Sequence, residues 1–380
     1  MKVAVSSTGV GRFGKRKEGL VELLCEAGRE ALDGLGRKPV DLLVVGHMAG
    51  GPLAHVENTV AKVADRLGLD AGAGFRIEAA SASGAAAFHA AVGMVRSGRY
   101  DRALVVAGEK MTDLPNAEVT KVLAGSLAPT EEAHGATMPA LAALVAGRYL
   151  DRYRADASAL DQVTTQARAA AARNPNAQFR TPVTVEEVRS SRAIALPLRL
   201  LHCSAISDGA AAVVVEGTTG AAGVLGLGQA TDHVELVERP ELTSFRATRV
   251  ASQRAFEEAR KTIQEVDFAE LHDAFAPFAL IDLEDVGAVG AGEGAAAFRN
   301  GSTSPDGPFP VNPSGGILGR GHPVGASGLV QIAEVARQLR GEAGPMALPK
   351  PPRRGLAQSI GGLGSHNFVT ILGNSGAARP

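Results

Sequence analysis

The stretch NPSGGILGRGHPVGASG, residues 312–328, ends in the letters ASG, and the same three letters stand at Ala82-Ser83-Gly84 in the first part of the chain. Each triplet opens a glycine-led helical pattern, from Gly84 to Gly98 and from Gly328 to Gly341. Two matching patterns in one chain indicate an internal duplication, and a duplication determines the fold more strongly than any local motif.

The segments before the two triplets also match. Residues 17–36, KEGLVELLCEAGREALDGLG, have helical spacing of apolar side chains and precede a strand at Val40-Asp41-Leu42-Leu43. In the second half the helical segment ASQRAFEEARKTIQ, residues 251–264, precedes a strand at Val266-Asp267-Phe268. This alternation predicts an α/β protein of two pseudo-symmetric βαβ halves with mostly parallel sheets.

Two such halves placed back to back would bring the two glycine-led helices together at their N-termini. Free N–H groups and the positive end of the helix dipole favour negative charge there, so we expect the functional site at this point. Residues 77–91, IEAASASGAAAFHAA, predict a buried strand that runs through small residues into the first of these helices. Ser81 is the reactive side chain at that turn.

The expected domain organisation follows from the duplication. An N-terminal half covers residues 1–217 and a C-terminal half covers residues 218–380. Residues from about 112 to 200 break the repeated pattern, and they predict an inserted loop domain that acts as a lid or substrate-binding subdomain.

Composition excludes several classes of function. The 39 basic and 40 acidic residues leave a net charge of −1 and form no block of one sign, which argues against nucleic acid and anionic membranes as partners. Apolar stretches end well before the ~20 residues that span a bilayer, so we expect a cytoplasmic protein. Cys25 and Cys203 form no disulfide framework. Each is predicted to be a small buried hydrophobe, with Cys203 far from the catalytic positions.

Two histidines stand in a context that favours chemistry. His322 precedes Pro323 at the mouth of a helix, where an imidazole can transfer a proton, donate to an oxyanion, or merely cap the loop. His272 lies in ELHDAFAPF, residues 270–278, as an oxyanion donor or a structural residue. Asp273 beside it would orient a ring or cap the next helix. We expect the histidines outside these contexts to be structural or exposed, including His47, His55, His89 and His202.

Seven segments together carry a family resemblance. They are SASG (81–84), HGATMPALAALVAGRY (134–149), RNPNAQFR (173–180), PLRLLHCSAISDGAAAVVV (197–215), ELHDAFAPFALIDLEDVG (270–287), NPSGGILGRGHPVGASG (312–328) and QSIGGLGSHNFVTIL (358–372). In this order they resemble the thiolase superfamily, in the branch of the sterol-carrier-protein-type and archaeal thiolases. The resemblance implies a five-layered αβαβα fold, a loop domain that holds the coenzyme A arm, and a homodimer or larger assembly. The implied substrate is an acyl-CoA thioester, with no metal and no permanently bound cofactor.

The resemblance also assigns candidate site residues. It implies catalytic roles for Ser81, His272, His322 and Ser359, and substrate-binding roles for Phe275, Gly321, Ser327, Gly361 and Gly362.

The chain departs from the family at its nucleophile. Ser81 stands where thiolases have a cysteine, and Ala274 and Ser359 stand where the second catalytic cysteine is found. A cysteine near a helix N-terminus ionises close to neutral pH, whereas a serine hydroxyl does not. Ser81 would therefore need His322 as a full general base.

Three functions remain open at this point. The first is a thiolase-type acyltransferase, with Ser81 either as a weak nucleophile or as an engineered replacement for cysteine. The second is an aldolase or lyase that cleaves a β-hydroxyacyl-CoA without an acyl-enzyme; similar aldolases need a small accessory protein with a zinc ribbon and an OB-fold. The third is a silent subunit that binds acyl-CoA. Acyl transfer ranks first, because the GHP loop, the HDAF segment and the loop domain keep the form that it uses.

Overall fold

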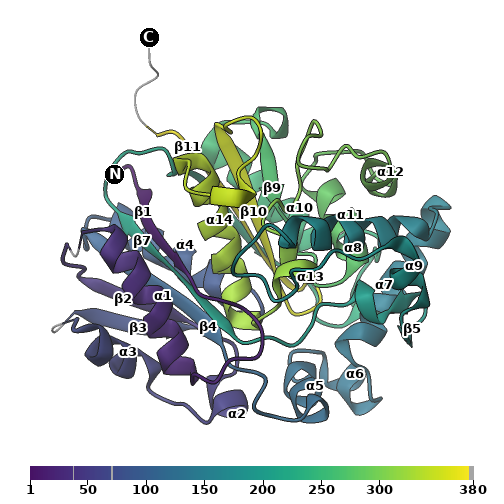
Figure 1. The fold of residues 1–380 in the computed structure, drawn as a ribbon, viewed down its shortest axis with the longest axis horizontal. Helices are drawn as coiled ribbons and strands as arrows, with labels where there is room; N and C mark the ends of the chain where they lie inside the picture. The colour runs from purple at the N-terminus through teal and green to yellow at the C-terminus, as the bar shows by residue number, and fades with distance from the viewer. Residues whose placement is uncertain (37, 70–71, 376–380) are drawn as a thin grey trace.

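The computed structural model describes residues 1–36, 38–69 and 72–375, and it confirms the predicted duplication (Figure 1). The last residues of the expected C-terminal half, 376–380, lie outside the described residues. The first half contains β1 (Ala4–Val10), α1 (Leu20–Gly34), β2 (Leu42–Gly46), α2 (Gly50–Ala54), α3 (Thr59–Leu67), β3 (Ala73–Ile77), α4 (Ser83–Arg96), β4 (Arg102–Glu109) and β7 (Gly209–Glu216). The second contains β8 (Gly223–Thr231), α10 (Arg246–Ala259), β9 (Phe268–Glu270), α11 (Ala276–Asp285), α12 (Gly294–Arg299), α13 (Gly316–Arg320), α14 (Ser327–Arg340), β10 (Arg354–Gly361) and β11 (His366–Gly373).

The strands repeat one order in the two halves. The sheet runs β3-β2-β4-β7-β1-β8-β11-β10-β9, so β8-β11-β10-β9 repeats β1-β7-β4-β2. The prediction of mostly parallel sheets is wrong: β2 pairs in parallel with β3 and β4, and β9 with β10, but β1–β7, β4–β7, β1–β8, β8–β11 and β10–β11 are antiparallel. The physical reason is that the last strand of each half returns antiparallel: β11 follows β10 in a hairpin, and β7 returns beside β4 after the long insertion.

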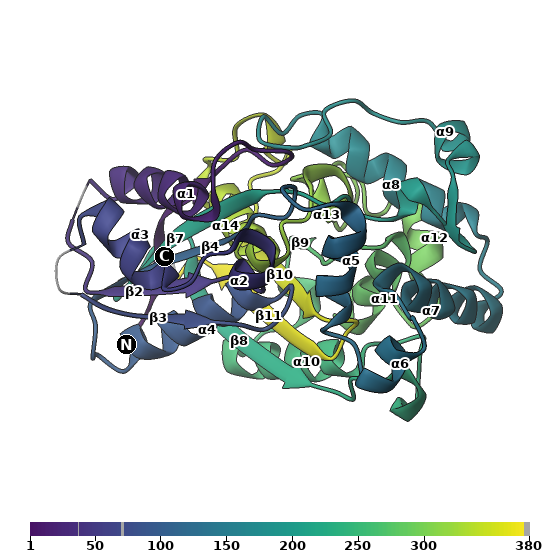
Figure 2. The same cartoon turned by 90° about the horizontal axis from the view of Figure 1, so that it is seen from below.

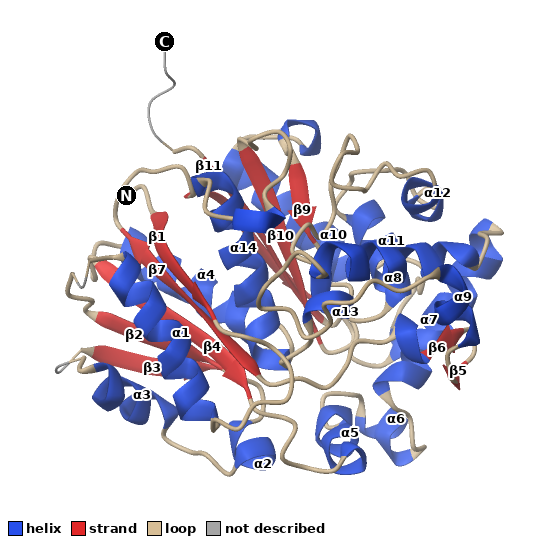
Figure 3. Cartoon of the chain, viewed as in Figure 1, coloured by secondary structure: helices blue, strands red, loops and turns tan. Residues whose placement is uncertain are grey.

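Three hydrophobic clusters define five layers (Figure 3). Helices α1 and α3 cover one face of the first half-sheet, and α10 and α11 cover the far face of the second. Helices α4 and α14 lie between the half-sheets and contact both. Neighbouring strand residues alternate between layers, since Val44 faces α4 and α14 while Val45 faces α1. The observed αβαβα architecture confirms the predicted fold class.

The two ASG triplets meet at the centre of the molecule. A Cβ on Gly84 would lie 2.8 Å from Leu329 Cβ, and a Cβ on Gly328 would lie 2.9 Å from Ala85 Cβ. Each glycine therefore lets the start of its own helix contact the start of the other. This reciprocal contact confirms that the N-termini of α4 and α14 lie together, as the duplication predicts.

The inserted segment lies beside the second half (Figure 2). It contains α5 (Asn116–Ala124), α6 (Pro129–Ala133), α7 (Met138–Tyr153), α8 (Ser158–Ala171), α9 (Val185–Ser190), β5 (Ala193–Ala195) and β6 (Leu198–Arg199). Helix α8 packs on α13, and α7 packs on α11. The insertion thus shares a hydrophobic cluster with the C-terminal half.

The buried strand expected at the start of residues 77–91 is not observed. Strand β3 ends at Ile77, and Ala73, Gly74 and Arg76 on it are exposed. It is the edge strand of the sheet, which explains its exposure. Across residues 1–36, 38–69 and 72–375, no helix has both the length and the apolar character that crossing a bilayer requires.

Candidate active site

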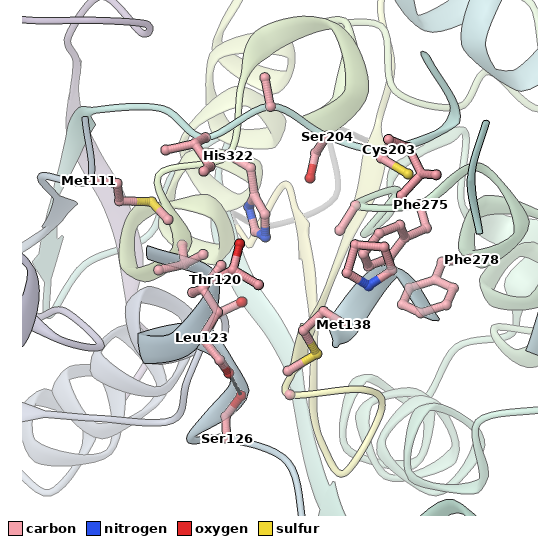
Figure 4. Close-up of a pocket in the computed structure, with 18 of the residues that line it drawn as sticks. Met111, Thr120, Leu123, Ser126, Met138, Cys203, Ser204, Phe275, Phe278 and His322 are labelled. Carbon is pink, nitrogen blue, oxygen red and sulfur yellow. Dashed lines mark hydrogen bonds between the residues drawn. The ribbon is translucent and has the colours of Figure 1, made fainter. Parts of the chain in front are cut away.

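One cavity of about 430 Å³ collects the principal predicted side chains. Ser81, His272, His322, Phe275 and Gly362 all line it. Figure 4 shows the His322 imidazole projecting into the space between Thr120 and Leu123 on one side and Cys203 and Phe275 on the other. The cavity lies where β3, β4 and β9 end, at the carboxyl ends of parallel strands, which is the usual place for a site in such sheets.

Ser81 occupies a sharp turn between β3 and α4. Ala80 before it has a φ of 49°, in the left-handed region that a residue with a Cβ rarely adopts. The Ser83 hydroxyl donates to Ala80 O at 2.6 Å and accepts from Ala79 N at 2.9 Å, which fixes the turn. The Ser81 hydroxyl makes no hydrogen bond with any residue that the structure describes, so it is free to meet a ligand.

His322 is held by the start of α14. Its Nδ1 lies 2.8 Å from Ser327 Oγ, and the same hydroxyl donates to Pro323 O at 3.1 Å. A hydroxyl has one hydrogen, so both bonds coexist only if Nδ1 carries the proton and donates to Ser327. Nε2 of His322 then holds a lone pair. The candidate site accordingly contains an unprotonated ring nitrogen that can accept a hydrogen bond or a proton.

His272 follows β9 and contacts His322 edge to face, with ring centroids 5.4 Å apart at 81°. Its backbone N–H donates to Gln358 Oε1 at 2.9 Å, which anchors the turn to β10. Its Nδ1 is buried and has no hydrogen-bond partner among the described residues. The ring is therefore placed by packing and backbone contacts, and Nε2 is the nitrogen left for a ligand.

Burial keeps both rings uncharged. It is the main cause that lowers the pKa of His322 to about 3, with the Arg320 cation as the next cause. Burial, then His322 and then Arg320, holds the pKa of His272 well below its ordinary value. At neutral pH the site thus presents two neutral imidazoles, one able to accept a proton and the other able to donate a hydrogen bond.

Asp273 caps a helix, although a different one from that which follows it. Its Oδ1 accepts from Ile317 N at 2.6 Å, in the first turn of α13. Burial raises the pKa of Asp273 to about 6, against the N–H donors that lower it. Of the two roles predicted for Asp273, capping is the one observed, and it ties the segment of His272 to the glycine-rich segment before His322.

Four further predicted residues surround the cavity without lining it. Ser327 is buried and holds His322, while Gly321, with a φ of 114°, lies against Ser207 and Gln178. Gly361 packs on Ala79 O, next to the turn of Ser81. Ser359 is buried against Gly328 and its hydroxyl has no partner within the described residues. In this structure the four residues therefore hold the segments around the cavity in place and do not form its wall.

Cys203 is not far from the candidate catalytic residues, and that prediction is wrong. It lines the cavity and pairs in an antiparallel bridge with Phe275, and the next residue, Ser204, donates its N–H to Ala274 O at 2.9 Å. Burial raises the pKa of its thiol to about 12, so the thiol is neutral. Cys25 is buried within α1, as expected.

The other buried histidines have structural partners, as expected. His47 lies 3.1 Å from Thr59 Oγ1 and His89 lies 2.9 Å from Thr370 Oγ1. His202 lies 3.0 Å from Asp161 Oδ1. None of the three lines the cavity.

Sequence reasoning missed most of the cavity wall. The missed apolar residues include Met48, Met111, Leu123, Met138, Ile206, Phe278 and Val324, and the missed polar ones are Asn116, Thr120, Ser126 and Ser204. Phe278 stands within the quoted HDAFAPF segment and could have been found there. The α5 residues carry no recognisable signal, because only tertiary packing brings the insertion to the cavity.

Neither the cavity wall nor the rest of the described residues offers a metal centre. No group of His, Cys, Asp and Glu in residues 1–36, 38–69 and 72–375 is arranged to hold a metal ion. The wall contains no Lys, Arg, Asp or Glu among the described residues, so the cavity suits an uncharged group.

Comparison with known proteins gives relatives along the whole chain. An acetyl-CoA acetyltransferase of Methanothermobacter thermautotrophicus is 38% identical over 92% of this chain and 94% of its own. Sterol carrier protein 2 of Oryctolagus cuniculus is 34% identical over 52% of this chain and 38% of its own. The solved structure titled "Ltp2-ChsH2(DUF35) aldolase" superposes with a TM-score of 0.85 at 25% identity, over 100% of this chain and 99% of that one.

Family comparison covers both halves. Residues 3–218 match the family described as "Thiolase, N-terminal domain", and residues 228–374 match "Thiolase C-terminal domain-like". The first match alone spans more than half of the chain, and it includes the turn of Ser81, while the second includes His272 and His322. With its duplicated αβαβα architecture and these two matches, the chain belongs to the thiolase family.

Proposed function

We propose that this protein is an acyl-CoA C-acyltransferase that carries the acyl group on Ser81. One observation carries the proposal: Ser81, His272 and His322 line the same cavity, with the Nε2 lone pair of His322 available as a base. The strained Ala80 supports it, because a left-handed alanine costs about 1 kcal/mol and such strain persists where a side chain must be presented. The apolar, uncharged wall suits the acyl end of a thioester.

The first half of the reaction forms an acyl-serine. Nε2 of His322 takes the proton of the Ser81 hydroxyl while Oγ forms a bond to the thioester carbonyl carbon. The carbon–sulfur bond then breaks, and the sulfur of coenzyme A receives the proton from His322. The products of this step are an ester on Ser81 and free coenzyme A.

The second half uses the same base. His322 takes a proton from the α-carbon of a second acyl-CoA, and the resulting enolate attacks the ester carbonyl. A carbon–carbon bond forms, the bond from carbonyl carbon to Oγ breaks, and Oγ recovers its proton from His322. Nε2–H of His272 stabilises the enolate oxygen, as a neutral imidazole donor does. This scheme needs no thiol at positions 274 or 359.

Aldol cleavage is the second candidate. Two observations favour it: the Ser81 hydroxyl has no hydrogen bond to His322 within the described residues, and the aldolase structure superposes over the whole chain. His322 would take the β-hydroxyl proton of a β-hydroxyacyl-CoA, and the Cα–Cβ bond would break to give an aldehyde or ketone. His272 would hold the enolate, and His322 would return the proton to the α-carbon. The zinc-ribbon and OB-fold partner belongs to this candidate.

Mass spectrometry separates the two candidates. Incubation with an acyl-CoA is expected to add the acyl mass to the Ser81 peptide, and Ser81→Ala is expected to abolish both the adduct and the release of coenzyme A. Ser204→Ala is the matched control, since it removes another hydroxyl from the same cavity wall and should keep the adduct. If Ser81→Ala cleaves a β-hydroxyacyl-CoA at the wild-type rate, the result contradicts acyl transfer as the function and supports the aldol reaction.

Ser81→Cys is expected to increase acyl transfer at pH 7.5 by about tenfold or more. A thiol with a pKa near 8.5 at a helix N-terminus supplies a thiolate far more readily than serine supplies an alkoxide. The measurement is the initial rate of coenzyme A release with acetyl-CoA and with a longer acyl-CoA. A rate equal to or below that of the wild type would contradict a nucleophile at position 81.

We also propose a homodimer. The outer edge of β3 has no strand partner among the described residues, and Phe75 and Ile77 on it are only partly buried. An edge of this kind readily pairs with another strand. Sedimentation at several concentrations is expected to give twice the mass of one chain, and a concentration-independent monomer would contradict the proposal.

A further inference from the structure

Arg320 is a fully buried cation two residues before His322. Its Nη1 donates to Ser314 Oγ at 2.7 Å and lies 3.6 Å from Glu270 Oε2. The Phe13 ring lies 5.9 Å from its guanidinium carbon. Its Nε and Nη2 have no partner among the described residues. Burying an arginine costs desolvation free energy, so a fully buried arginine beside the candidate site indicates a specific role for its side chain.

The contacts of Arg320 join the two segments that carry the histidines. Glu270 is the last residue of β9, two residues before His272, and it accepts from Ser314 N at 3.0 Å and from Ser314 Oγ at 2.8 Å. Ser314 lies in the glycine-rich segment that leads to His322. Arg320, Ser314 and Glu270 thus form a buried polar clamp between the two segments.

The charges around the rings leave Arg320 as the cation that acts on both. It lowers the pKa of His322 after burial, and it lowers the pKa of His272 after burial and His322. Burial raises the pKa of Glu270 to about 7, so below that pH its carboxyl does not cancel the Arg320 charge. Asp273 and Glu334 are the other carboxyls that face Arg320, and burial raises the pKa of both.

We infer that Arg320 is a positioning residue for the reaction: through Ser314 and Glu270 it holds the strand end of His272 against the loop of His322. The inference rests on the proposed roles of the two histidines. It concerns how the two rings are held beside each other rather than which bond they help to make. Its principal readout is therefore ring titration, which does not require either proposed reaction.

The test compares Arg320→Gln with Arg320→Lys. Glutamine removes the charge but can still bond to Ser314, and lysine keeps the charge. Histidine ring signals in NMR are expected to show both rings neutral down to pH 5 in the wild type and in Arg320→Lys. In Arg320→Gln the pKa of His322 should rise above its wild-type value, because a nearby cation that disfavours the charged ring is lost. Rates at pH 5.5 and 7.5 should differ by less than about twofold within each protein, while Arg320→Gln lowers the rate at both pH values and Arg320→Lys restores it.

Arg168→Gln is the matched control, since Arg168 is also a buried arginine, stacked on Phe179, but lies outside the cavity wall. It should lower stability without moving either ring titration. Identical titrations in Arg320→Gln and the wild type, with lower thermal stability alone, would reduce Arg320 to a structural residue and overturn the inference. If Arg320→Gln does not fold, Ser314→Ala decides, because it breaks the same clamp: a shifted His322 titration would uphold the inference and an unchanged one would overturn it. A failed acyl-transfer assay with the expected ring titrations would overturn the proposed reaction and leave the inference standing.

Discussion

Replacement of His322 by alanine is expected to reduce acyl transfer about 10³–10⁴-fold, or about 4–5 kcal/mol of transition-state stabilisation. In the proposed scheme Nε2 of this one ring moves every proton, and the described residues of the cavity wall include no carboxylate or amine that could replace it. The affinity for acyl-CoA should change far less, because the apolar wall remains. The measurement is coenzyme A release under single-turnover conditions, together with acyl-CoA binding by calorimetry.

His233→Ala is the control for His322→Ala, since His233 is an exposed histidine outside the cavity. It should retain the wild-type rate. If His322→Ala keeps more than about a tenth of the wild-type activity, His322 is not the general base, whether or not Ser81 is the nucleophile.

Gly228→Ala is expected to destabilise the fold by about 3 kcal/mol or to prevent folding. A Cβ at Gly228 would lie 1.7 Å from Ala251 O, and one at Gly226 would lie 2.0 Å from Ala255 O, so α10 contacts β8 through the bare backbone of these two glycines. Neither backbone oxygen can rotate away as a side chain does, so the whole helix must move. Guanidinium unfolding and the yield of soluble protein measure the loss.

Gly93→Ala provides the opposite expectation. Gly93 is exposed on α4, and no atom of the described residues lies within 4 Å of an added Cβ. Alanine should therefore stabilise the protein by about 0.5–1 kcal/mol through its higher helix propensity. Equal stability of Gly228→Ala and Gly93→Ala would show that α10 can shift without cost and would contradict the close approach.

The sequence alone predicts the site residues whose positions follow from the residues next to them in the chain. Ser81, His272 and His322 each stand beside a strand end or a helix start, and the duplication predicted that the two halves meet there. Gly84 and Gly328 could be read as equivalent because both open the same ASG pattern. These features need only short-range patterns and one internal comparison.

The remaining features depend on contacts between segments distant in sequence. Cys203 reaches the cavity because it pairs with Phe275 in the second half, and no local pattern indicates that bridge. Arg320 stands in a glycine-rich stretch of sequence, where a charge is normally exposed, and its burial as the last residue of α13 is explained only by its contacts with Ser314 and Glu270. The antiparallel strands were missed because β7 returns to the sheet only after the long insertion.

The reciprocal contact of Gly84 and Gly328 has a consequence for how the two halves can diverge. At both positions the side chain is a hydrogen atom that lies against the start of the other helix. A methyl group at either position would clash with that helix and push the two helix starts apart. Such a displacement would carry the serine of one half away from the histidine of the other. Selection on a reaction therefore constrains two glycines that do not line the cavity, and the ancestral duplication remains recognisable at this contact, where neither helix start has room for a larger residue.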